Sequence, residues 1–163
     1  MKLLAKEKFV SLHRKFYVKN ENGENVFEIS SKPISIGFKT TIKDLKGEKL
    51  AYIEEEILHL MSHYKIYIGD KLVCKIAKKF KILKNDYSIT NGYKVDGDFF
   101  GLNFSVYNDK NEEIGRIKRK FFAITDKYEI DIPNDKDKMI VLAIVVAISN
   151  DVNREQENTT DFD

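Results

Sequence analysis

The feature that most restricts the fold is an unbroken apolar run near the end of the chain, from Met139 to Ile148. A helix that is apolar on every side has to be enclosed by protein or by lipid. As a helix the run spans about 15 Å, which is half of a hydrocarbon core of about 30 Å. The run therefore predicts a helix buried inside the protein's own fold, and no transmembrane segment.

Flanking residues place this helix at about residues 136–152. Asp135 or Asp137 can cap its N-terminus, where negative charge is favourable, and Ser149 to Asp151 end the apolar stretch. Because Ile and Val dominate the run, a central strand of a sheet is the alternative. Residues 155–163 are polar, and we expect a disordered tail there.

A second pattern, strand, polar turn, strand, recurs from Lys15, Lys39, Lys65 and Asn103. Apolar and polar residues alternate with the period of a half-buried strand, and the turns contain Asn, Asp and Gly. Further turn signals, including Asp96 to Asp98, suggest roughly a dozen strands, as in a sandwich or barrel. The expected inward pairs are Phe16 and Val18, Phe27 and Ile29, Thr40 and Ile42, Ala51 and Ile53, Ile66 and Ile68, Cys74 and Ile76, Phe104 and Val106, and Gly115 and Ile117.

The ordered hairpins, best seen in KNENGENVFEI (19–29) and KDLKGEKLAYI (43–53), precede one apolar helix. This order resembles the LURP-one-related (YxjI-like) family, relatives of the tubby C-terminal and phospholipid scramblase domains. The resemblance runs from about Phe9 to about Val152. It implies a mainly β, tubby C-terminal-like fold, a closed antiparallel barrel of about twelve strands around the buried helix. We therefore expect a single domain over residues 1–154.

Tubby-type domains bind phosphoinositide head groups and scramblases act on phospholipids, so the resemblance suggests an anionic lipid ligand but assigns no site residue. The formal net charge of +2 gives no reason to expect a nucleic-acid partner. A single cysteine excludes an internal disulfide, and the first residues do not form a signal peptide. We expect a cytoplasmic monomer, peripheral at the inner membrane face.

No nucleotide-binding loop or nucleophile elbow occurs in the sequence, so we expect no enzyme and no cofactor. His59 and His63 have a metal-ligand spacing only if they are helical, and a loop or strand-end pair with no metal is expected instead. Cys74 falls on the inward register as a small hydrophobe. Glu54 to Glu56 alternate faces along a strand and are interpreted as a solvated surface.

The strongest local signal is basic. Two strands in comparable positions carry Lys and Arg next to aromatic residues, and they could meet in a patch for phosphate-bearing head groups. Lysines also protect strand edges and keep proteins soluble without any ligand. The sequence therefore suggests a non-catalytic domain that binds anionic phospholipid at a membrane, or alternatively a protein-interaction or scaffold module. The candidate ligand-binding residues are Lys78, Lys79, Lys81, Arg116, Lys118 and Arg119.

Overall fold

The computed structural model describes residues 1–6, 15–32, 35–80, 86–120 and 127–160. These residues form twelve strands, one short 3-10 helix, η1 (Asp135–Asp137), and one α-helix, α1 (Lys138–Thr160). The strands are β1 (Lys2–Lys6), β2 (Lys15–Asn20), β3 (Asn25–Ser31), β4 (Lys39–Lys43), β5 (Lys49–Glu55), β6 (His63–Ile68), β7 (Lys71–Lys79), β8 (Asp86–Ile89), β9 (Lys94–Asp98), β10 (Asn103–Tyr107), β11 (Glu113–Lys120) and β12 (Lys127–Asp131).

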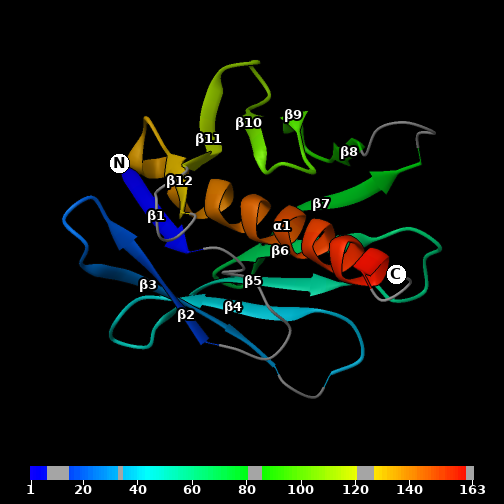
Figure 1. Cartoon of the computed structure of the whole chain (residues 1–163), viewed down its shortest axis with the longest axis horizontal. Coiled ribbons are helices and arrows are strands. Elements are labelled where there is room, and N and C mark those ends of the chain that lie inside the picture. The colour runs from blue at the N-terminus through cyan, green and yellow to red at the C-terminus, as the bar shows by residue number, and fades with distance from the viewer. Residues whose placement is uncertain (7–14, 33–34, 81–85, 121–126, 161–163) are drawn as a thin grey trace.

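All strands belong to one antiparallel sheet, with the order β8-β7-β6-β5-β4-β3-β2-β1-β12-β11-β10-β9. The first strand, β1, pairs with the last strand, β12, from Lys2 opposite Asp131 to Lys6 opposite Lys127. The edge strands β8 and β9 contact each other without a strand pairing between them. The sheet is therefore a nearly closed barrel, and α1 runs through its middle (Figure 1). This confirms the expected fold class.

Helix α1 is the centre of the core. Its residues from Ile140 to Val152 are all buried, and the inward side chains of the strands surround it. The apolar run is a helix and not a strand, because a residue in the middle of a barrel is covered on every side. The predicted inward pairs are confirmed, with Phe16 and Ile68 half-buried and the others buried.

The helix is longer than residues 136–152. It continues to Thr160, so residues 155–160 are helical and not a disordered tail, while residues 161–163 lie outside the described part of the chain. Contacts with the barrel hold the additional turns in place. Glu155 forms an ion pair with Lys78, and the Gln156 side chain donates a hydrogen bond of 3.2 Å to the Phe100 carbonyl.

Helix and sheet are in close contact at β11. A Cβ atom added to Gly115 would lie 2.3 Å from the nearer Val141 methyl carbon, so the missing side chain of Gly115 leaves the space that Val141 occupies. Gly97 has a related role on β9, where its φ of 139° brings the backbone against Phe104. The predicted turn at Asp96 to Asp98 is therefore wrong: these residues are strand, and the glycine permits close strand pairing.

Three hairpins share one turn. The side-chain oxygens of Asn20, Asp44 and Asn108 each accept two backbone N–H groups, from the residues two and four positions further on. The fourth residue of each turn has a positive φ, at Gly23, Gly47 and Asn111. These turns lie at the same end of the barrel as the start of α1, and we call it the turn end. A side chain that satisfies its own backbone explains why the sequence predicts these hairpins.

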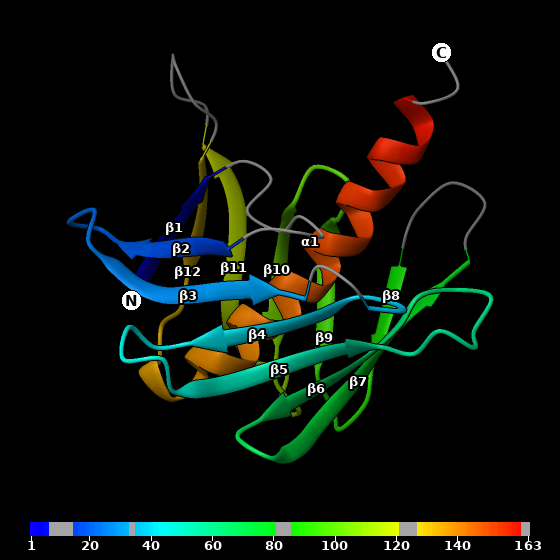
Figure 2. The same ribbon diagram turned by 90° about the horizontal axis from the view of Figure 1, so that it is seen from below.

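The opposite end of the barrel, where α1 leaves it, we call the loop end (Figure 2). It includes the described connections 56–62 and 99–102. Exposed apolar side chains collect in these connections and beside them. They are Ile36, Ile57, Leu58, Leu60, Phe80 and Phe100.

Candidate anion-binding site

The predicted basic residue Lys78 is not at the surface. Its side chain points into the barrel, where Nζ lies 2.9 Å from Oδ2 of Asp151 on α1. The Tyr87 hydroxyl donates a hydrogen bond of 2.6 Å to the same oxygen, and Ser62 donates to the other carboxylate oxygen. The Tyr64 hydroxyl lies 3.4 Å from that second oxygen. Side chains from β6, β7, β8 and the residue before β6 thus converge on one helix carboxylate.

A second ion pair extends this network toward the loop end. The guanidinium of Arg154, one turn after Asp151, contacts both carboxylate oxygens of Glu55 at 2.8 and 3.0 Å. Glu55 also accepts the backbone N–H of Phe38 at 2.9 Å. The solvated surface predicted for Glu54 to Glu56 is therefore wrong for Glu55, because this position faces inward at the mouth of the barrel and meets the helix.

The network has definite protonation states. Burial alone would raise the pKa of Asp151, but hydrogen bonds from Ser62, Tyr87 and Lys78 and the charge of Lys78 outweigh burial and hold it below its ordinary value. Burial, together with the charge of Asp151, raises the pKa values of Tyr64 and Tyr87, which stay neutral hydrogen-bond donors. An ionised acid with cationic and neutral partners fixes the helix in the barrel. Lys78 is thereby committed to Asp151 and not to a ligand.

Of the other five predicted residues, the four that the structure describes do not form one patch. Lys79 is exposed on the outer face of β7, and Lys81 lies outside the described residues. On β11, Arg116 and Lys118 face outward. Arg119 is on the inner face of the sheet, where it pairs across the strands with the buried Tyr128 of β12. Strands β7 and β11 are separated in the barrel by β8, β9 and β10. The two basic strands therefore do not meet.

Strand pairing instead gathers lysines that are far apart in the sequence. Lys6 on β1, Lys127 on β12 and Lys120 on β11 lie directly opposite one another across neighbouring strands. Two residues further along, Glu129 is buried between Lys118, whose Nζ is 3.1 Å away, and Lys120. Burial would raise the pKa of Glu129, but hydrogen bonds from Lys120 and Lys118 lower it. The Glu129 carboxylate therefore offsets part of the positive charge of this row.

A groove opens beside this row. Strands β1 and β2 pair at two positions, Leu3 with Asn20 and Leu4 with Lys19, and then diverge. The hollow between them has a volume of about 430 Å³. Its described lining contains no carboxylate, and its lysine ammonium groups and aromatic rings suit a phosphate-bearing head group. These residues are Lys6, Lys15, Lys19, Lys127, Phe16 and Tyr17.

We call the outer-face residues Lys6, Lys15, Lys19, Lys118, Lys120 and Lys127 the lysine surface. The sequence analysis found only Lys118 of this set. Lys120 belongs to the same basic run, 118–120, while Lys6, Lys15, Lys19 and Lys127 come from other strands. Their common surface depends on the pairing of β1 with β12, which brings the two ends of the sheet together.

His59, His63 and Cys74 are the residues that the sequence analysis weighed for metal or thiol chemistry. His63 begins β6 and its ring stacks on that of His59, with centroids 3.8 Å apart. Among the described residues, no group of three His, Cys, Asp or Glu side chains is placed to hold a metal ion. Cys74 is buried, as predicted, and burial raises the pKa of its thiol to about 12. A thiol with that pKa is a poor nucleophile near neutral pH.

Comparison with known proteins agrees with this architecture. The family described as LURP-one-related matches residues 1–149. The chain belongs to this family. The LURP-one-related chain is 26% identical over 149 residues to the Uncharacterized protein YxjI of Bacillus subtilis (strain 168), covering 91% of each chain. It also shares its fold with the X-ray structure of a protein from Arabidopsis thaliana, with a TM-score of 0.61 and 18% identity over 93% of this chain and 90% of the other.

The identity to the solved structure is low, so this likeness concerns the fold. Within the described residues, no helix combines the length and the apolar character needed to cross a membrane, and the apolar part of α1 gives way to polar residues after Ile148.

Proposed function

We propose that this LURP-one-related chain is a non-catalytic domain that binds anionic phospholipid head groups at a membrane surface. The observation that carries the proposal is the row formed by Lys6, Lys127 and Lys120, directly beside a groove that contains Lys15 and Lys19. The inner face of the cell membrane is the surface that such a domain would meet in the cytoplasm.

Local charge matters more here than the net charge of +2. Each Lys close to an anionic membrane contributes about 1 kcal/mol, and the effect falls away within a Debye length of about 10 Å at 0.1 M salt. Several lysines on one face are therefore enough for reversible binding. Arg116 and Lys118 of the original candidate set lie on the outer face of β11, next to the row, and belong to this proposal. Lys79 is on another side of the barrel.

Co-sedimentation with vesicles tests the proposal. Binding is expected to phosphatidylcholine vesicles that contain phosphatidylglycerol or a phosphoinositide, to weaken as salt is added, and to be absent with phosphatidylcholine alone. Equal binding to neutral vesicles, or no binding to either kind, would contradict an electrostatic lipid site.

A matched pair of variants locates the surface. The double change Lys6→Glu and Lys127→Glu should abolish most of the binding, because it inverts the charge of the row. The double change Lys46→Glu and Lys110→Glu alters net charge equally at exposed positions of the turn end and should leave binding nearly unchanged. If both double variants lose binding to the same extent, net charge and not the lysine surface is responsible.

A further inference from the structure

The connection between β5 and β6, residues 56–62, carries the most exposed apolar side chains of the described chain. Leu58 and Leu60 are 94% and 102% exposed. The connection lies at the loop end, beyond the barrel wall on the side toward which α1 leaves (Figure 2). We infer that this connection, which we call the leucine loop, inserts Leu58 and Leu60 into the hydrocarbon edge of a membrane. The inference rests on the proposed function, since the lysine surface brings the protein to the bilayer.

Hydrogen bonds to neighbouring segments close the base of the leucine loop. The N–H of Glu56 donates to the carbonyl of His63 at 2.8 Å, and the Ser62 carbonyl accepts the N–H of Lys78 at 2.9 Å. The Nδ1 atom of His63 lies 2.8 Å from the Met61 carbonyl. Polar backbone groups without partners are what keep most loops out of lipid. This loop removes part of that cost before it meets a membrane.

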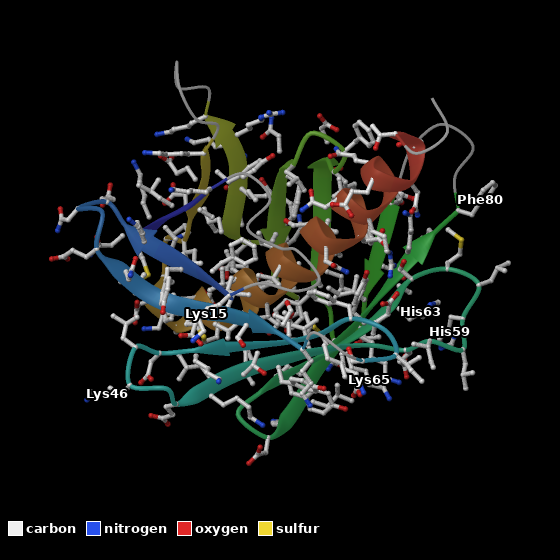
Figure 3. All side chains as sticks on the ribbon, turned by 60° about the horizontal axis from the view of Figure 1, so that its bottom comes forward. Lys15, Lys46, His59, His63, Lys65 and Phe80 are labelled. Atoms are coloured by element: carbon white, nitrogen blue, oxygen red, sulfur yellow. The ribbon has the colours of Figure 1, made fainter. Side chains whose placement is uncertain are left out.

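The surroundings of the loop also suit an interface between water and lipid. Ile36 and Ile57 are 74% and 52% exposed and border the same hollow as Leu58, so the apolar surface is wider than two leucines. The Glu56 carboxylate below the tip is held by Lys65 at 2.9 Å. Figure 3 shows His59, His63 and Lys65 together at the base of the loop, with Phe80 on the same side of the molecule and Lys46 at the far end.

A membrane fits this surface better than a protein partner does. Binding energy between proteins concentrates in well-packed pockets filled by Trp, Tyr or Arg, and Leu is under-represented there. The two leucines here project from a convex tip, which fluid lipid chains can surround without a matching shape. Lysine side chains on the strands below an apolar loop tip can contact the phosphate groups of lipids, while the tip itself lies deeper in the bilayer.

The chain contains no tryptophan, so an introduced one reports alone. Leu58→Trp and, separately, Leu60→Trp should shift their emission to the blue on vesicles of phosphatidylcholine and phosphatidylglycerol, and should be quenched by brominated lipid chains. Leu45→Trp is the control, because Leu45 is a 58% exposed leucine in a turn of the opposite end. It should bind equally well and keep the emission of a water-exposed residue.

A second pair of variants measures the contribution to affinity. Leu58→Gln with Leu60→Gln should weaken vesicle binding about tenfold or more, while Leu45→Gln with Leu72→Gln should have little effect. If the tryptophan variants sediment with vesicles but their emission stays unshifted and unquenched, insertion is wrong and the lysine surface alone binds. If the unchanged protein does not sediment with anionic vesicles, the proposed function fails and insertion fails with it.

Discussion

The ammonium group of Lys78 lies 2.9 Å from the carboxylate of Asp151, with 5% and 2% of the two side chains exposed. One partner comes from the barrel wall and the other from the helix inside it. Their ion pair, with the hydroxyl groups of Tyr87 and Ser62, fixes the rotation and depth of α1 more specifically than apolar contacts alone could.

Replacing Lys78 with Met should therefore lower the free energy of unfolding by about 3–5 kcal/mol, because it leaves the Asp151 carboxylate buried without its cation. Urea denaturation followed by circular dichroism measures this. The control is Lys79→Met at the next position, which faces outward and should change stability by less than about 0.5 kcal/mol. Equal changes in the free energy of unfolding at both positions would mean that the buried ion pair contributes no more to stability than an exposed lysine does.

Acid should remove the stabilisation that Asp151 provides. Its pKa in the folded protein is below the ordinary value of 3.8, so its contribution is complete above about pH 4 and is lost as the pH falls through the folded pKa. The stability difference between the unchanged protein and Asp151→Asn should thus stay constant from neutrality to about pH 4 and narrow as the pH falls further. Asp70→Asn, at a fully exposed side chain, should show no such change. A difference that stays constant with pH would contradict the argument.

The contact between Gly115 and Val141 makes a packing prediction. Gly115→Ala should cost about 1–3 kcal/mol, because the new methyl group occupies the space of a Val141 methyl group. Adding Val141→Ala should recover part of the loss, so the double variant should be more stable than the sum of the single effects predicts. Strict additivity in denaturant unfolding would show that helix and strand do not meet there as described.

The shared turn predicts unequal effects at equivalent positions. Gly47→Ala should cost about 1 kcal/mol, because a residue with a side chain is strained at its φ of 88°. Asn111 takes the same place in the third turn with a φ of 63°, and Asn111→Gly should be neutral or slightly stabilising. Thermal unfolding compares the two variants. Destabilisation by Asn111→Gly would indicate that the asparagine side chain has a role beyond its backbone conformation.

Much of the fold could be predicted because its signals are local. The turn at Asp44 can be recognised from five consecutive residues. The alternation of apolar and polar residues in each strand identifies the face that points inward. The apolar run predicts an enclosed position, because apolar residues without alternation have no side that can face water. Its Ile and Val content suits a strand as well as a helix, and only the surrounding barrel decides for the helix.

The candidate site depended on contacts that the sequence does not display. Lys78 continues the inward register of Cys74 and Ile76, but it looked like a surface cation because its partner, Asp151, is far away along the chain and the sequence does not show a buried acid that it could meet. The row of Lys6, Lys127 and Lys120 exists only because the first and last strands pair. Gly97 was wrongly predicted as a turn residue, because glycines with a positive φ occur at close contacts between strands as well as in turns.

The order of elements also constrains biosynthesis. Residues 138–160 leave the ribosome after all twelve strands, yet they supply the interior against which those strands pack. The strands therefore emerge with their apolar faces exposed and gain a complete core only when the helix arrives. Folding of this barrel has to finish after translation has passed the helix, and the nascent chain is most vulnerable to aggregation just before that moment.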